Sequence, residues 1–269
     1  AKEKIKEYKA NIDVLTMTAT PIPRTMHMSI VGIRDMSVIY EPPHNRKPVQ
    51  TYVLEYDDEV VKEAITREIE RNGQVFYLYN KVEGIEKKAN EVSKLVPEAK
   101  VGFAHGKMTG KELEQIMMDF IQKKINVLVC TTILESGIDI PNANTLIILD
   151  ADKFGLSQLY QIRGRVGRNE LQSYCILVSS HETKRLDILT KTTDGFKVSE
   201  EDFKLRGSGD LFGIKQSGDM CFSVANIKND FNILVKAQQD SLEFLNNKEY
   251  LLEENINVKK IIESSINLD

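Results

Sequence analysis

The sequence predicts an α/β fold in which helices cover both faces of a doubly wound parallel sheet, followed by an α-helical appendage. Short apolar runs alternate with helix-like stretches between about residues 45 and 182. These runs are continuously apolar, which is typical of strands buried on both faces of a parallel sheet. Beyond residue 182 the apolar runs give way to amphipathic and polar stretches that favour helix. The alternation of strand and helix therefore indicates a sheet domain of about 150 residues with helices appended to it.

Six strand-like runs make up the expected sheet. They are TYVLEY (51–56), QVFYLYN (74–80), KVGFAHG (100–106), INVLVCTT (125–132), TLIILD (145–150) and SYCILVSS (173–180). Helix-like stretches follow the first three of these runs. In the first stretch Asp57 or Asp58 is suited to cap the amino end of the helix, and Gly73 is suited to cap its carboxyl end.

The appendage begins with a helix after residue 182 and continues into a glycine-rich loop at 205–219. An amphipathic helix is expected over 226–247, and the last twenty residues are polar and favour helix. Four glycines of the loop follow Arg206, and Gln216 lies between the last two of them. Such a loop is either a flexible surface segment or one that adapts its shape to a partner, and the residues alone leave both interpretations open.

Composition limits the classes of protein to which the chain can belong. With 269 residues, 41% of them hydrophobic, it can bury a sizeable core. No apolar run reaches the roughly 20 residues that span a bilayer, so we expect no membrane partner. The net charge of −4 predicts that any nucleic-acid interface is a local patch. The chain opens on Ala1 without an apolar leader, and we expect it to be a piece of a longer protein.

The three cysteines, Cys130, Cys175 and Cys221, are far apart, and no histidine joins them in a zinc-binding spacing. We therefore expect no metal site. Cys130 and Cys175 lie within apolar runs, which predicts packing roles in a reducing cytoplasm.

No phosphate-binding loop of the G-x-x-x-x-G-K-[S/T] type is present. Gly106 and Gly110 precede Lys111, but their spacing is wrong and Glu112 follows instead of a hydroxyl residue. A self-sufficient nucleotide hydrolase of that class is therefore not expected in this chain.

The segment TTILESGIDIP (131–141) follows an apolar strand, and ligands of open α/β sheets bind where strands end. Gly137 permits close approach of the backbone, and Asp139 can accept a hydrogen bond from a sugar hydroxyl. Thr131 or Thr132 can donate to a phosphate. The alternative is an ordinary transition from strand to turn with incidental polar residues.

The string QLYQIRGRVGR places Arg163, Arg165 and Arg168 around Gly164 and Gly167. On a helix, the second and third arginines would point the same way. Planar guanidinium groups stabilise the charge of a phosphate during its transfer. The alternative is a solvated basic helix, but each glycine would weaken such a helix by about 1 kcal/mol. The pattern therefore favours a phosphate-binding role.

Two further groups of residues are weaker candidates. Thr18 and Thr20 end an apolar run before two prolines in LTMTATPIPRTM, which on its own is typical of a linker. His105 lies between a strand and a loop with no nucleophile arranged beside it, and a lone histidine is more often structural than catalytic.

Together these segments resemble the second, RecA-like motor lobe of superfamily 2 helicases and translocases. TATP resembles motif III, QVFYLYN motif IV, TTILESGIDIP motif V and QLYQIRGRVGR motif VI, and they follow in the order of that superfamily. Up to about residue 170, segments such as GQVFYLYNKVEGI and LVPEAKVGFAHGKM resemble those of the bacterial transcription-repair coupling factors. From about residue 173 onward they resemble the RecG helicases.

The resemblance implies a domain arrangement and a set of partners. Residues 1–44 would end the first lobe and link it to the second, which would occupy 45–182. Residues 183–269 would hold a helical hairpin, the loop of the translocation motif and C-terminal helices. ATP and Mg²⁺ would be held mainly by the first lobe, and double-stranded DNA would be the partner. RNA polymerase and repair proteins would bind through other domains.

Roles for individual residues follow from the same resemblance. Arg165 and Arg168 would reach the phosphates of ATP, with Gln161 positioning the site, and Gly137 and Asp139 would line the nucleotide cleft. The DNA-contacting or coupling residues would be Thr18, Thr20, His105, Gly106, Thr131, Arg206 and Gln216.

The sequence leaves three hypotheses of function open. The first is the second lobe of a DNA translocase in transcription-coupled repair, inactive without its first lobe. The second is a RecG-type helicase acting on branched DNA. The third, from another class, is a non-catalytic protein-docking module derived from a motor lobe. An RNA helicase fits the TATPIPRT phrase and the appended loop less well.

Overall fold

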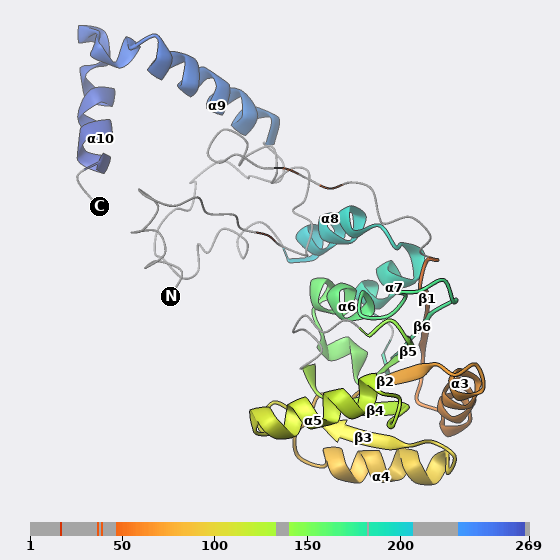
Figure 1. The fold of residues 1–269 in the computed structure, drawn as a ribbon. Coiled ribbons are helices and arrows are strands. Elements are labelled where there is room, and N and C mark those ends of the chain that lie inside the picture. The colour runs from red at the N-terminus through yellow and green to blue at the C-terminus, as the bar shows by residue number, and fades with distance from the viewer. Residues whose placement is uncertain are drawn as a thin grey trace. The chain divides into compact units, whose positions relative to one another are not determined.

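The computed structural model contains one six-stranded sheet in which every neighbouring pair of strands is parallel. It describes residues 47–132, 140–181, 183–206 and 231–266, together with Met17, Ser37 and Ile39. The strands lie in the order β1-β6-β5-β2-β4-β3 (Figure 1). They are β1 (Gln50–Leu54), β2 (Gln74–Leu78), β3 (Val101–Ala104), β4 (Val127–Cys130), β5 (Ala143–Ile148) and β6 (Tyr174–Val178). The predicted fold class is therefore confirmed.

Helices cover both faces of this sheet. One face is covered by α3 (Asp58–Glu70) and α4 (Ile85–Leu95). The other face is covered by α5 (Gly110–Ile121), α6 (Leu156–Arg163) and α7 (Lys184–Lys191), and the short 3-10 helix η3 (Ala151–Lys153) precedes α6. Successive side chains of a strand point to opposite faces, so each strand serves both cores. In β2, Phe76 and Leu78 pack on the side of α5 and α6, whereas Val75 and Tyr77 pack on the side of α3 and α4.

The first helix shows what local signals predict well and what they do not. Asp57 caps α3, and its Oδ1 accepts a hydrogen bond of 2.8 Å from the N–H of Glu59. The prediction that Gly73 caps the other end is wrong, because the helix ends at Glu70 and Arg71 is its C-cap. Asn72 takes the left-handed conformation, with φ of 57°. Glycine is required at position 73 because a Cβ atom there would occupy the space of the Glu68 carboxylate.

The helices beyond β6 confirm an α-helical appendage. Among the described residues from 47 on, those up to Asp202 belong to one compact unit and those from Phe203 to another. In the first unit, Leu186 and Leu189 of α7 lie in the core. Asp202 of α8 (Gly195–Arg206) accepts a hydrogen bond of 2.5 Å from the hydroxyl of Ser157 in α6. The other helical elements are α9 (Phe231–Asn246), η4 (Glu249–Leu251), η5 (Glu253–Asn255) and α10 (Ile256–Ile266). In the described part of the chain, no helix has the length and apolar character to cross a bilayer.

Candidate nucleotide and nucleic-acid interfaces

The described residues contain about half of the predicted site. Six predicted positions, His105, Gly106, Thr131, Gln161, Arg165 and Arg168, are described with their surroundings. Arg206 is the last residue of α8. Thr18, Thr20, Gly137, Asp139 and Gln216 lie outside the described residues.

Three of the predicted DNA-contacting residues lie together at the carboxyl edge of the sheet. His105 and Gly106 follow β3, and Thr131 follows the neighbouring strand β4. The N–H of Thr131 donates to the carbonyl oxygen of Ala104 at 3.2 Å, so the parallel ladder continues to the point where both strands end. The structure therefore brings these three residues together, as their positions after neighbouring strands require.

His105 is held by stacking. Its ring lies over Phe103 with 6.3 Å between the ring centroids and an interplanar angle of 29°. Within the described residues, its buried Nδ1 has no hydrogen-bond partner. The N–H of Met108 donates to the His105 carbonyl oxygen at 3.1 Å and closes a turn on which Gly106 is exposed. The exposed backbone at Gly106 is the part of this turn that a ligand can approach closely.

Glu112, which breaks the phosphate-loop pattern, has a structural task in the same loop. Its carboxylate accepts hydrogen bonds of 2.8 Å from both the N–H and the hydroxyl of Thr109, while the Thr109 hydroxyl accepts from the Glu112 N–H. This capping box begins α5. The bond from the Thr109 backbone is the main cause that lowers the pKa of Glu112 below its usual value. The role of Glu112 is therefore to cap the amino end of α5.

The two predicted phosphate-binding arginines lie on a turn, and the prediction that they share a helix face is wrong. Helix α6 ends at Arg163, and Gly164 is its C-cap. The N–H of Arg165 donates to the carbonyl oxygen of Ile162 at 3.0 Å, which tightens the chain as it leaves the helix. We call residues 164–168 the arginine turn. Gly167 within it has φ of +75°, a left-handed conformation that glycine adopts without strain.

The arginine turn lies at the amino edge of the sheet, where the parallel strands begin. A Cβ atom on Gly167 would lie 2.9 Å from Cγ2 of Val49 and 3.7 Å from Cβ of Ser173, two residues that immediately precede β1 and β6. The reason is the crossover between parallel strands: α6 begins after the carboxyl end of β5 and must return the chain to the amino end of β6. The candidate site is thus divided between two edges of one sheet.

Arg163 differs from its two neighbours in the motif because it is buried, with 4% of its surface exposed. Its Nη1 donates to the carbonyl oxygens of Leu189 at 2.7 Å and Thr192 at 3.2 Å. Its guanidinium carbon lies 5.3 Å from the ring centroid of Tyr160. Burial lowers the pKa of Arg163 below its usual value. Arg163 therefore joins α6 to α7 and does not face a ligand.

Arg165, Arg168 and Gln161 are half-buried, as side chains at a ligand-facing edge would be. The Nε of Arg168 donates to the carbonyl oxygen of Gly164 at 3.4 Å, which spans the turn. Gln161 lies in the last turn of α6, and its carbonyl oxygen would be 3.3 Å from a Cβ atom on Gly164. Glycine at 164 thus lets the chain turn directly after Gln161.

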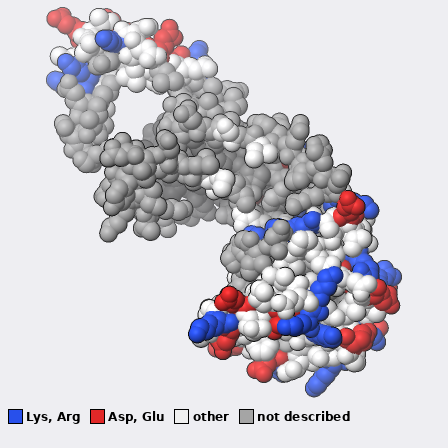
Figure 2. Space-filling view, in the orientation of Figure 1, with Lys and Arg blue, Asp and Glu red and all other residues white. Residues whose placement is uncertain are grey.

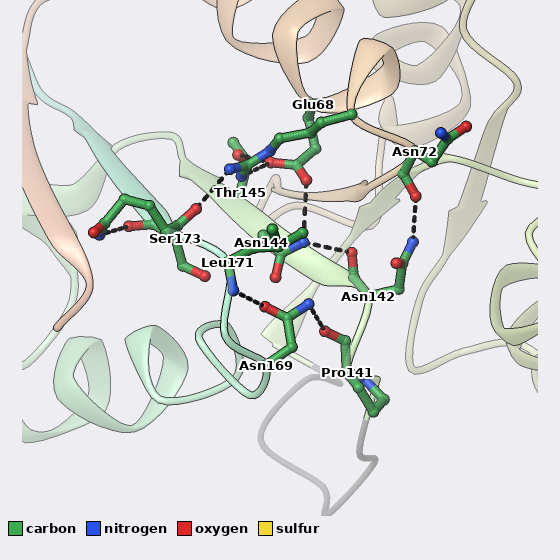
Figure 3. Close-up of polar contacts among 11 residues, drawn as sticks. Glu68, Asn72, Pro141, Asn142, Asn144, Thr145, Asn169, Leu171 and Ser173 are labelled. Carbon is green, nitrogen blue, oxygen red and sulfur yellow. Dashed lines mark hydrogen bonds and ion pairs between the residues drawn. The ribbon is translucent and has the colours of Figure 1, made fainter. Parts of the chain in front are cut away.

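Sequence reasoning missed a polar network at the amino edge (Figure 3). Its centre is Glu68 on α3, which is 1% exposed. Donors to the Glu68 carboxylate are Asn144, at 3.2 Å, the hydroxyl of Thr145 and the guanidinium of Arg71. A signal was present, because Val61, Ile65 and Glu68 follow helical spacing on the apolar stripe of α3.

A second missed residue is Asn169, which directly follows the arginine turn. Its Nδ2 donates to the carbonyl oxygen of Pro141 at 2.8 Å, and its Oδ1 accepts from the N–H of Leu171 at 2.9 Å. The local signal was an asparagine after a glycine-rich turn, where its side chain often bonds to the backbone two residues on.

Charge alone does not mark an interface. On the face drawn in Figure 2, Lys and Arg side chains are interspersed with Asp and Glu side chains over the described part of the sheet unit. Among the residues that the structure describes, no group of three or more His, Cys, Asp or Glu side chains could hold a metal ion.

Comparison with known families gives two matches. Residues 57–170 match the family described as "Helicase conserved C-terminal domain". Residues 192–263 match "ATP-dependent DNA helicase RecG, domain 3, C-terminal". The first match covers the strands and helices from α3 to the end of the arginine turn.

Curated relatives are similar over most of this chain. The chain is 56% identical to the transcription-repair-coupling factor of Bacillus subtilis over 227 residues, which are 81% of this chain and 19% of the relative. It is 48% identical to that of Escherichia coli over 263 residues, 92% of this chain and 23% of the relative. The chain thus spans about a fifth of the length of these relatives.

One solved structure is similar in both sequence and fold. A structure described as RecG bound to a three-way DNA junction is 39% identical, with a TM-score of 0.66. The match covers 83% of this chain and 31% of that one.

Proposed function

Because this chain carries a helicase C-terminal domain and resembles transcription-repair-coupling factors over most of its length, we propose that it is the second motor lobe of an ATP-dependent double-stranded DNA translocase acting in transcription-coupled DNA repair. The full-length protein would be the ATP hydrolase, and this lobe alone would be inactive. We place the protein in the cytoplasm, where DNA and RNA polymerase would be its partners.

The observation that carries this proposal is the division of the candidate residues between two edges of one rigid sheet. Arg165 and Arg168 lie at the amino edge, whereas His105, Gly106 and Thr131 lie at the carboxyl edge. A DNA translocase needs one surface that binds its nucleotide and another that binds DNA. Parallel strands between the two edges would transmit a movement of the first to the second without deforming.

At the amino edge, the donor chemistry fits a nucleotide. We assign Arg165 and Arg168 to the phosphates of ATP, where two forked cations would stabilise the charge that develops during phosphoryl transfer. Gln161 would help to position the site, and Gly137 and Asp139 would line it. ATP with Mg²⁺ supplies the phosphoryl group whose hydrolysis drives the cycle, and a first lobe would hold most of it.

At the carboxyl edge, Thr131, His105 and Gly106 would contact the DNA backbone, which carries no sequence information. Thr18, Thr20, Arg206 and Gln216 would serve DNA contact or coupling. Closure of the lobes on ATP and opening on its products would then step the protein along the duplex, because each state binds the nucleotide with a different affinity.

Substitution of Arg165 tests the proposal. In the full-length protein, Arg165→Ala is expected to reduce DNA-stimulated ATP hydrolysis by at least about a thousandfold, as loss of such arginines does in phosphoryl transfer. The chain described here should show no ATP hydrolysis by itself. Normal turnover in the Arg165→Ala protein would refute the assignment.

A second candidate function is a RecG-type helicase acting on branched DNA. It is favoured by the match of residues 192–263 to a RecG domain and by the similarity to a RecG structure. The two candidates differ in partner. Binding of the full-length protein to RNA polymerase would support the first, and preferential stimulation of its ATP hydrolysis by three-way junctions over linear duplex would support the second.

A further inference from the structure

Asn169 joins the arginine turn to the segment that enters β5. Its Oδ1 accepts from the N–H of Leu171 at 2.9 Å, a bond within its own loop. Its Nδ2 donates to the carbonyl oxygen of Pro141 at 2.8 Å, a bond between segments that are 28 positions apart in the sequence. The residue before Asn169 is Arg168, and Pro141 follows the segment that carries Gly137 and Asp139. One amide therefore connects the end of the arginine turn to the chain that enters β5.

Pro141 is followed by residues that are hydrogen-bonded to helix α3 and to the turn after it. We call Glu68, Arg71, Asn142 and Asn144 the Glu68 frame. The neighbouring Asn142 donates to the carbonyl oxygen of Asn72 at 2.8 Å. The Nδ2 of Asn144 donates to the carbonyl oxygen of Asn142 at 3.1 Å and to Glu68 at 3.2 Å. These bonds fasten the entry to β5 to helix α3 and to the turn that follows it (Figure 3).

A further bond connects the Glu68 frame to the residues that follow Asn169. Arg71, which pairs with Glu68, also donates through Nη1 to the carbonyl oxygen of Gln172 at 2.7 Å. Gln172 follows Leu171, whose N–H is bonded to Asn169. Asn169 thus completes a ring of polar contacts that runs through the buried carboxylate of Glu68. A buried charge with several donors resists displacement, because moving it would leave the charge unsatisfied.

We propose that Asn169 is a positioning residue, which fixes Arg165 and Arg168 relative to the segment entering β5 by fastening the arginine turn to the Glu68 frame. This inference rests on the proposed function, in which both arginines act on the phosphates of ATP. The physical reason is geometric. A catalytic group displaced by about 1 Å can cost about a hundredfold in rate, even when the lost contact contributes little to stability.

The chain offers a closely matched control in Gln172. Its Nε2 donates to the carbonyl oxygen of Pro48 at 2.8 Å, so it too is a side-chain amide bonded to a proline carbonyl at the amino edge. Substituting the Gln172 side chain leaves its backbone carbonyl bonded to Arg71. The Nε2 of Gln172 also donates to the carbonyl oxygen of Ser173 at 3.1 Å. Asn169→Ala and Gln172→Ala therefore each remove two hydrogen bonds, and only those of Asn169 start from the residue that directly follows the arginine turn.

The experiment measures DNA-stimulated ATP hydrolysis of both variants in the full-length protein. Asn169→Ala is expected to lower kcat by about ten- to a hundredfold and to change KM for ATP less than about twofold. Gln172→Ala should keep kcat within about twofold of the parent protein. Both variants should shift the urea midpoint of unfolding to a similar extent. Equal loss of kcat in the two variants would overturn the inference.

Asn169→Asp separates the two bonds of Asn169. The aspartate keeps an oxygen for the N–H of Leu171 but has no donor for Pro141. It should therefore lose as much kcat as Asn169→Ala, and retention of the parent kcat would show that only the local turn matters. Arg165→Ala is assayed in parallel: normal turnover there would refute the proposed function. Loss of turnover there together with an unaffected Asn169→Ala would refute the positioning role alone.

Discussion

The Nη1 atom of Arg163 lies 2.7 Å from the carbonyl oxygen of Leu189 and donates a hydrogen bond to it. This bond ties the carboxyl end of α6 to α7. Arg163 is two residues from Arg165 in a motif whose arginines look equivalent in the sequence. The structure divides them by burial into one that holds helices together and two at the edge of the sheet.

Arg163→Ala is expected to lower the free energy of unfolding by about 2–4 kcal/mol. It would leave the carbonyl oxygens of Leu189 and Thr192 without their donor and would open a cavity beside Tyr160. Urea-induced unfolding of the chain measures the change. Arg165→Ala, at a half-buried position, should cost less than about 1 kcal/mol. A similar cost for both arginines would contradict the division between them.

The left-handed conformation of Gly167 gives a second prediction. Gly167→Ala should destabilise the chain by about 1–2 kcal/mol, because alanine is strained at φ of +75° and its Cβ would meet Cγ2 of Val49 at 2.9 Å. Gly110→Ala is the matched control. Gly110 begins α5, and a Cβ atom there would meet nothing within 4 Å, so alanine should be neutral or slightly stabilising. Urea unfolding of the two variants provides the comparison, and a stable Gly167→Ala chain would show that the turn relaxes.

Burial of two thiols predicts how stability depends on pH. Burial raises the pKa of Cys175 from 9.0 to about 12, and it also raises that of Cys130. Between pH 9 and about 12 the Cys175 thiol ionises in the unfolded chain but not in the folded one. The free energy of unfolding therefore falls as pH rises through this range, and the full contribution is present below pH 9.

Alkylation and unfolding measurements check this prediction. In a Cys221→Ser chain, Cys130 and Cys175 should resist iodoacetamide at pH 8 and react after addition of urea. Unfolding at pH 8 and pH 10 should show a smaller loss of stability in Cys175→Ala than in the parent. Rapid alkylation of the folded chain would show that the thiols are accessible.

The sequence predicted the strands well because the fully buried strands are mostly apolar, with polar side chains only near their amino ends. β2 (Gln74–Leu78), β4 (Val127–Cys130) and β5 (Ala143–Ile148) are buried along their whole length. Local patterning does not record which strands become neighbours, so the order β1-β6-β5-β2-β4-β3 came only from the structure. The same limit applies to the edge at which the arginine turn lies, because that edge is set by the return of α6 to the start of β6.

The roles of glycines were harder to predict, because a glycine can cap a helix, adopt a left-handed backbone or leave space for a neighbouring side chain. Gly73 was expected to end α3, but a Cβ atom there would lie 1.6 Å from Oε1 of Glu68. The requirement comes from a side chain five positions earlier. The glycines of the arginine turn were taken to favour a phosphate-binding role, whereas Gly167 is required by its own left-handed backbone conformation. Of the candidate site, the position of His105 and Thr131 at the carboxyl edge was predictable, because each follows a strand of a parallel sheet, whereas their proximity depends on the pairing of β3 with β4.

The separation of the two edges predicts that their substitutions affect different kinetic parameters in the full-length protein. Arg168→Ala should lower kcat for ATP hydrolysis by at least about a hundredfold, while the DNA concentration for half-maximal stimulation stays within about twofold. His105→Ala should raise that DNA concentration by about fivefold, the equivalent of one lost contact of about 1 kcal/mol, and should leave kcat at saturating DNA nearly unchanged. Titration of DNA at saturating ATP separates the two parameters. If both variants changed kcat alone, the carboxyl edge of the sheet would not be the surface that holds DNA.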